Sequence, residues 1–185
     1  MGLFSQNFSQ KLILDRPSQT PTASASAKAL PQVRLYYEIS VSDESILTMT
    51  GASNKEWTDY IGSKPAAEDR RISLQLPDAL LENLTISTTN EDITLPALAV
   101  TRQISLSTNG GSIAFETLDV GSALTLSAKN GDISGAVAGS YDGFSIQTEI
   151  KKGESNLPGD KDDGEKALRV SCNNGDIDIA FVNGN

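Results

Sequence analysis

The sequence predicts an all-β protein: a right-handed parallel β-solenoid with coils of about 20 residues, capped by N-terminal strands. Two observations carry this prediction. Apolar strand segments recur at an interval of 20 residues, beginning at Leu84, Ile104, Leu124 and Phe144. Turns rich in Asn, Gly and Asp recur in step with them, each closed by an isoleucine at Ile93, Ile113 or Ile133. A fixed period of this size is typical of stacked repeats, and parallel crossovers are nearly always right-handed.

Composition limits the classes of function. The 185 residues include 15 Lys and Arg against 24 Asp and Glu, a net charge of −9, which disfavours binding to nucleic acid. The chain has no His and one Cys, so it lacks the commonest general base and cannot form an internal disulfide. No apolar run is long enough to span a membrane. The first residues, Met1–Gln6, lack the basic and apolar segments of a signal peptide.

The first part of the chain predicts a cap. We expect residues 1–32 to contain one strand, from Phe8 to Leu14, and a connection rich in Pro, Ser and Ala. Residues 33–182 are expected to form a single solenoid domain, with a cap region at 33–70 and the repeats at 72–181. In the cap, strands at 33–41 and 45–50 are predicted to pair across Asp43-Glu44, and a strand at 72–76 is predicted to end at Pro77.

The repeats predict an inward and an outward face. Strand side chains alternate between faces, so three alternate positions in each coil point into a shared core. These positions are Leu84, Ile86, Thr88; Ile104, Leu106, Thr108; Leu124, Leu126, Ala128; Phe144, Ile146, Thr148; and Leu168, Val170, Cys172. The residues between them are mostly Ser and Thr. A second strand follows each turn, and a third apolar flank is marked by Leu98 and Val100, matched by Leu118 and Val120.

The corners predict a structural column of glycines. Gly111, Gly131, Gly153 and Gly175 fall at equivalent positions, and glycine is the residue best suited to a tight corner with positive φ. Neighbouring Asn and Asp side chains are expected to cap the corner amides. Residues 157–166 interrupt the period and predict an exposed, charged loop.

The repeats also resemble a known family. The segments Ile72–Pro77 and Lys152–Pro158, the Asn-Gly-Asp-Ile corners at 130–133 and 174–177, and the segments at 47–49 and 56–62 carry the resemblance. They are similar to a bacterial adhesin domain family, an all-β repeat module of the cell envelope with unassigned biochemistry. The resemblance covers about residues 33–182 and implies no catalytic residues. Glu91 stands where the family has a corner glycine, and Ser155 where it has isoleucine.

One candidate metal site is a column of corner carboxylates. Asp92, Asp132, Glu154 and Asp176 would lie about 5 Å apart in a solenoid, and stacked carboxylates can share a calcium ion. Calcium-binding rolls, however, repeat every nine residues, and Ser112 interrupts the column. We therefore interpret the column as turn capping and expect no cofactor. Cys172, in the inward column, is interpreted as a small buried thiol.

A candidate ligand face combines aromatic and charged residues. Trp57 and Tyr60 either bind a sugar or cover the open end of the solenoid; the second interpretation is favoured. Lys129, Glu149 and Arg169 project outward, one from each coil, as a row. Some β-helices are carbohydrate-active enzymes that use grouped carboxylates, but without His no Ser or Thr looks activated. A row of mixed charges is more often a solvated surface.

The favoured function is therefore a non-enzymatic β-solenoid of the cell envelope, an adhesin or a surface scaffold. A carbohydrate-binding or carbohydrate-active β-helix is the first alternative, and an extracytoplasmic sensor domain coupled to a membrane partner is the second. We expect an extracytoplasmic location, on the cell surface or anchored through a segment outside this chain. The expected partner is an envelope protein or a glycan, and open strand edges also allow end-to-end pairing of copies.

Overall fold

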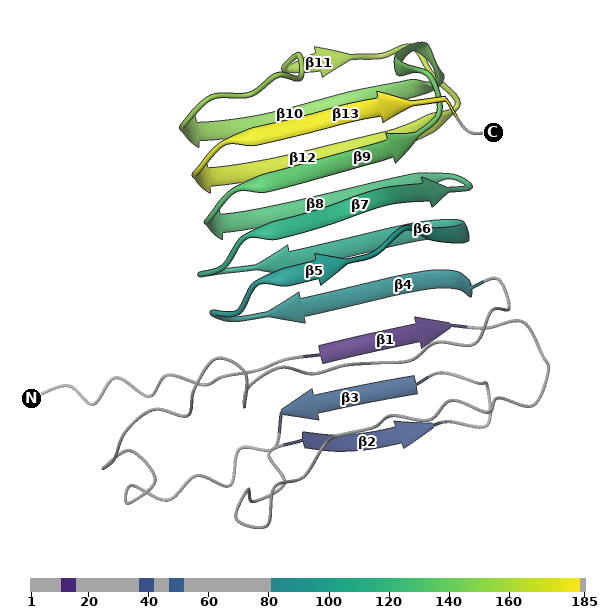
Figure 1. Ribbon diagram of the computed structural model, residues 1–185, viewed down its shortest axis with the longest axis vertical. Coiled ribbons are helices and arrows are strands. Elements are labelled where there is room, and N and C mark those ends of the chain that lie inside the picture. Colours follow the sequence, from purple (N-terminus) through teal and green to yellow (C-terminus); the bar gives the residue numbers. More distant parts are fainter. Residues whose placement is uncertain (1–10, 16–36, 42–46, 52–80, 184–185) are drawn as a thin grey trace, which may run out of the picture.

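The computed structural model describes residues 11–15, 37–41, 47–51 and 81–183. The regular secondary structure of the described residues is nearly all strand, with one short 3-10 helix, η3 (Tyr141–Gly143). The strands from residue 81 onward form parallel stacked coils, a β-solenoid of about five turns, which confirms the predicted fold class (Figure 1).

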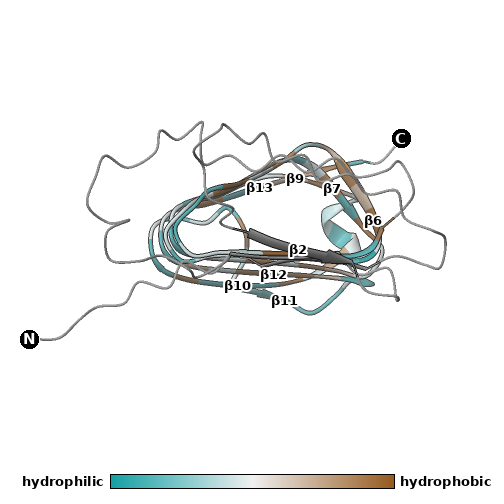
Figure 2. Cartoon of the chain, turned by 90° about the horizontal axis from the view of Figure 1, so that it is seen from below, coloured by the Kyte–Doolittle hydropathy of each residue, from teal (hydrophilic) through white to brown (hydrophobic). Residues whose placement is uncertain are grey.

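The solenoid has two main faces. Five strands form the first face, in the spatial order β4 (Leu81–Thr88), β6 (Leu98–Thr108), β8 (Ala123–Asn130), β12 (Lys166–Asn174) and β10 (Phe144–Lys152). The second face consists of β5 (Ile93–Leu95), β7 (Ile113–Val120), β9 (Ile133–Ala138) and β13 (Ile177–Val182). Seen from below, the two faces are the long sides of a flattened loop (Figure 2). The predicted third flank is confirmed, because Leu98 pairs with Leu118 and Val100 with Val120.

Three antiparallel strands continue the first face on its N-terminal side. They are β1 (Lys11–Asp15), β2 (Tyr37–Val41) and β3 (Leu47–Gly51). The predicted pairing of the two cap strands is confirmed, since Val41 pairs with Leu47 and Tyr37 with Gly51. β1 lies between β3 and β4, antiparallel to both, so the N-terminal strand joins the cap to the first coil. The expected strand at 72–76 lies outside the described residues.

The coils do not stack in chain order. β12 lies between β8 and β10, with Leu168 paired to Leu124 on one side and to Ile146 on the other. The fifth coil along the chain is therefore fourth in space, and the coil that begins with β10 is outermost (Figure 1). The corner Asn130-Gly131-Asp132-Ile133 thus meets its own sequence copy at 174–177. Asn174 Nδ2 donates a hydrogen bond to Asn130 Oδ1 at 2.7 Å, so the two identical corners are joined by an asparagine ladder.

The register of β10 also differs from the prediction. Leu84, Ile104 and Leu124 stack in one column as expected, but the next two members are Leu168 and Ile146. Phe144 lies two residues earlier, at the level of Lys166. Leu168 lies 44 residues after Leu124 and 22 residues after Ile146, whereas the prediction used an interval of 20. The prediction therefore placed Phe144 in the column at the position that Ile146 occupies.

The core is a dry, continuous stack. Most of the inward residues are buried, whereas Ile86, Thr88 and Thr148 are partly buried. The largest fully buried side chains are Phe144, Leu84, Ile104, Leu106, Ile113, Leu118, Leu124, Leu126, Ile133, Ile146, Leu168 and Ile177. Each such side chain contributes about 1.5–3 kcal/mol through burial, and no single coil could bury its own inward face alone. Stacking is therefore what stabilises the fold.

The insertion at 157–166 covers the outer end of the solenoid. It was predicted as an exposed loop, and most of its residues are exposed, but Leu157 is buried. β11 (Asp160–Lys161) pairs antiparallel with β10, opposite Ile146 and Gln147. Lys161 Nζ donates a hydrogen bond to the carbonyl of Phe144 at 2.8 Å. The insertion therefore shields part of an edge that would otherwise be open for pairing.

Candidate functional site

A shallow, open groove lies on the second face of the solenoid. It has a volume of about 480 Å³ and crosses β5, β7 and β9. Its lining combines apolar, hydroxyl and carboxylate groups, from Thr94, Leu95, Pro96, Ala114, Phe115, Glu116, Ser134 and Gly135. This mixture of an apolar surface with a few polar groups is typical of a small-molecule or sugar site.

The groove exists because the stacking of β7 on β9 is irregular. Between Ala114 and Thr117 the register shifts, so that two residues of β7 oppose one residue of β9. The residue opposite is Gly135, and a Cβ at that position would overlap the ring of Phe115. The aromatic ring thus occupies the space of a missing side chain in the next coil. Small residues and a bulge at one point leave the outer surface hollow there.

The polar groups of the groove come from three successive coils. The hydroxyls of Thr94 and Ser134 are exposed, as is the carboxylate of Glu116. Glu116 Oε2 accepts a hydrogen bond from the backbone N–H of Ala97 at 3.3 Å, which orients the carboxylate beside the groove. Among the described residues that line the groove, Glu116 is the only ionisable one. The groove can accept and donate hydrogen bonds, but it does not place two carboxylates together.

The groove was not predicted from the sequence, although the second strands contain a signal for it. The second strands begin Ile93-x-Leu95 and Ile113-x-Phe115, and the next copy is Ile133-x-Gly135. A glycine where the pattern requires an apolar residue indicates a bulge or a close approach of side chains.

The corner carboxylates form a ladder of hydrogen bonds. From the second coil onward, the corner donates a backbone N–H to a side-chain oxygen of the coil before it in the stack: Ser112 to Asp92 at 2.8 Å, Asp132 to Ser112 at 3.1 Å, Asp176 to Asp132 at 2.9 Å, and Glu154 to Asp176 at 2.8 Å. This is the capping that the sequence predicted. Ser112 continues the ladder through its hydroxyl and does not interrupt it.

The Asp carboxylates of the candidate calcium column thus accept hydrogen bonds from backbone N–H groups. In the part of the chain that the structure describes, no group of three or more metal-binding side chains is placed to hold an ion. Each of the three Asp side chains uses Oδ1 to accept an N–H from the adjacent corner. The geometry favours the structural interpretation of this column.

Replacing Asp132 separates capping from metal binding. Asp132→Ala removes the acceptor for the Asp176 N–H and should lower the free energy of unfolding by about 0.5–1.5 kcal/mol. Asp132→Asn keeps an acceptor oxygen and should remain close to wild type. Urea unfolding with and without calcium measures both effects. A rise in stability with calcium that is lost in Asp132→Asn would contradict the capping interpretation.

The glycine column is explained by contact between coils. Gly131, Gly153 and Gly175 have φ of +141°, +127° and +146°. A Cβ at any of them would overlap the glycine carbonyl of the adjacent coil, and a Cβ at Gly111 would overlap the carbonyl of Glu91. Glu91 is the first member of the column among the described residues, which explains why a side chain is accepted there.

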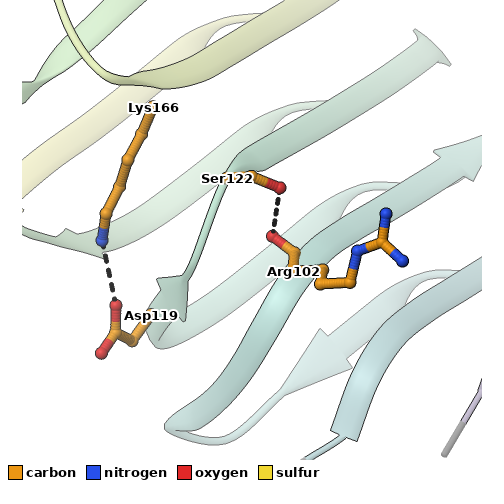
Figure 3. Close-up of polar contacts among 4 residues, drawn as sticks. All are labelled: Arg102, Asp119, Ser122 and Lys166. Carbon is orange, nitrogen blue, oxygen red and sulfur yellow. Dashed lines mark hydrogen bonds and ion pairs between the residues drawn. The ribbon is translucent and has the colours of Figure 1, made fainter.

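The third corner of the coil is held mainly by backbone contacts. The N–H of Ser122 donates to the carbonyl of Arg102 at 2.8 Å, and its hydroxyl donates to the same oxygen at 2.9 Å (Figure 3). Lys166 and Asp119 form an ion pair there at 3.4 Å. Both charged groups are partly exposed, so the pair contributes little to stability.

The predicted row of charged residues is not a row. Lys129, Glu149 and Arg169 are all exposed, as expected. The strand register, however, places Arg169 opposite Thr125 and Gln147, and Glu149 opposite Ser171. The three residues therefore lie at different positions along their strands. Trp57 and Tyr60 lie outside the described residues, so their predicted roles stay predictions.

Cys172 is the small buried thiol that the sequence predicted. It is 1% exposed, and its Sγ lies 3.4 Å from the carbonyl oxygens of both Gly131 and Gly175, either of which can accept its single S–H. Burial raises the pKa of the Cys172 thiol, and the nearby carboxylate of Asp132 raises it further. A thiol held in the protonated form is a poor nucleophile, so this residue serves packing.

Comparisons of the chain with protein-family models, curated proteins and solved structures found no match. Within the described residues, no helix is long and apolar enough to cross a membrane. The resemblance to the adhesin domain family therefore stays a prediction from the sequence pattern.

Proposed function

We propose that this protein is a non-enzymatic β-solenoid of the cell envelope that binds a glycan, as an adhesin or a surface scaffold. The observation that carries the proposal is the groove across β5, β7 and β9. It offers apolar atoms of Leu95 and Pro96 beside the exposed hydroxyls of Thr94 and Ser134. A sugar ring has apolar C–H faces and a rim of hydroxyls, so this surface fits its chemistry.

Of the polar groups in the groove, Glu116 is expected to form the strongest hydrogen bonds with a sugar. Its exposed carboxylate lies at the edge of the groove and can accept two hydrogen bonds from sugar hydroxyls. Hydrogen bonds to a charged group are roughly twice as strong as neutral ones. The stacked coils place polar groups at intervals of about 4.8 Å, which suits a ligand with its own repeat, such as a polysaccharide.

The enzymatic alternative requires a different arrangement. Glycoside hydrolases place two carboxyl groups about 5–10 Å apart across the bond that they break. Glu116 is the single carboxylate in the groove lining that the structure describes. The carboxylate of Glu149, which the alternative would use, projects from the first face instead. A hydrolytic site would need a second carboxylate that the groove does not contain.

A glycan array tests the proposal. We expect the wild-type protein to bind a polysaccharide and Glu116→Gln to weaken binding by about tenfold or more, because a charged acceptor is lost. Glu149→Gln is the matched control, since it removes an exposed carboxylate from the other face. Binding that both variants retain in full would exclude this groove. Release of reducing ends that Glu149→Gln abolishes would favour the enzymatic alternative.

A further inference from the structure

β12 lies between β8 and β10, two strands that both precede it in the chain. The space between them is therefore filled only after both have formed. After β9 the chain passes one coil level and forms β10, which pairs with β12 and with β11 but not with β8. β12 then enters between β8 and β10 and is parallel to both. Its companion β13 stacks on β9 on the second face. Until β12 and β13 arrive, β8 and β9 end in an open edge and β10 lacks its parallel neighbour.

We propose that β12 and β13 of one copy can fill the slot of a second copy, so that two chains exchange residues 166–182. The inserted strands would make the same contacts in either copy: Leu168 with Leu124 and Ile146, and Asn174 with Asn130. Because those contacts are identical, the closed monomer and the exchanged dimer differ only in the connection between β10 and β12. Exchange of an identical element is a low-cost route to a dimer.

The connection has the properties of a hinge. Residues 158–165 are mostly exposed and can span roughly 26–29 Å when extended. In the closed form, the connection is held by the pairing of β11 with β10 and by the N–H of Thr148, which donates to the carbonyl of Gly159 at 2.9 Å. Opening this segment breaks these contacts and the hydrogen bond from Lys161 Nζ to the carbonyl of Phe144, whereas removing β12 exposes buried residues that a second copy can cover again.

Gly164 sets the balance between the two forms. Its φ is +139°, and a Cβ at this position would overlap the backbone of Phe144 while the hinge is closed. An open hinge removes both restrictions. Gly159 belongs to the same connection, but a Cβ there would meet nothing within 4 Å. Gly164→Ala and Gly159→Ala are therefore a matched pair, of which only the first strains the closed form.

The exchange joins copies at a defined end. β10 is at the opposite side of the sheet from the antiparallel strands β1, β3 and β2. An exchanged dimer would place the two outer coils next to each other and the two N-terminal caps far apart. This arrangement presents two grooves on one particle, which raises the avidity for a repetitive ligand.

A disulfide between β8 and β12 distinguishes exchange from surface association. Thr125 and Arg169 are paired on the outward face, at a strand spacing of about 4.8 Å that a disulfide can bridge. The full chain with Thr125→Cys and Arg169→Cys, in a Cys172→Ala background, is unfolded, refolded at increasing concentration, oxidised and run on a denaturing, non-reducing gel. The cross-link joins one chain to itself in the monomer and two chains in the exchanged dimer.

We expect a covalent dimer band that grows with protein concentration during refolding. Gly164→Ala should raise the dimer fraction by roughly fivefold or more over Gly159→Ala, because the strain acts only on the closed hinge. Copies that pair end to end without exchange would elute as dimers but give only monomer bands, which would overturn the proposal. If Gly164→Ala does not fold, the concentration series with the native hinge decides alone, and monomer bands at every soluble concentration overturn the proposal.

Discussion

Gly131→Ala should lower the free energy of unfolding by about 2–4 kcal/mol, because it combines backbone strain with overpacking. Gly131 lies at φ +141° in the middle of the glycine column. Its new Cβ would overlap the carbonyl oxygen of Gly111 in the adjacent coil. The overlapping atom belongs to the backbone, so no side-chain rotation can relieve it. The coils would have to separate at this corner and would break the ladder between Ser112 and Asp132.

Urea unfolding followed by circular dichroism measures this change. Gly159→Ala is the control, since its Cβ would lie in open space, and it should change the free energy of unfolding by less than about 0.5 kcal/mol. Equal midpoints for the two variants would show that the corner glycines are not pressed against the neighbouring coil, and the column would lose its structural explanation.

Leu168→Ala should cost about 2–5 kcal/mol of unfolding free energy. The side chain is fully buried and stacks between Leu124 and Ile146. Truncation leaves a void with a coil on each side, and neither coil can collapse into it without losing its own register. The size of the effect depends on the observed coil order, since it requires that β12 lie inside the stack.

Arg169→Ala provides the comparison for this variant. Arg169 is the next residue of β12, on the outward and exposed face, and its truncation should stay within about 0.5 kcal/mol of wild type. Differential scanning calorimetry of the two variants at one protein concentration measures the difference. A Leu168→Ala protein as stable as Arg169→Ala would contradict the placement of β12 between β8 and β10.

Much of the first three coils could be predicted from the sequence because the pattern there is local. An interval of 20 residues places Leu84, Ile104 and Leu124 in one column, and the structure pairs them in that register. Corner capping by Asp92 followed from the same interval, since its Oδ1 accepts the backbone N–H of Ser112, one repeat of 20 residues later. In both cases the structural partners lie one repeat of 20 residues apart.

The candidate site was not predictable to the same extent. The groove depends on Gly135 and on a register shift in β7, and the period continues undisturbed on the first face of the same coils. In the sequence, nothing distinguishes Glu116 from the other charged residues that are expected to face solvent. Its position beside Thr94 and Ser134 follows from a bulge, which changes the outer surface without changing the repeat.

The sequence by itself determined that coils form, which residues point inward and where glycine must stand. These properties follow from the alternation of strand side chains and from short-range sterics. Only the tertiary structure decided the order of the coils and the hollow on the second face. A coil presents a similar edge to any other coil of the chain, so local pattern alone does not rank the partners. That choice is made by the fit of whole strands, in which Asn174 bonds to Asn130 and Leu168 fills the space between Leu124 and Ile146.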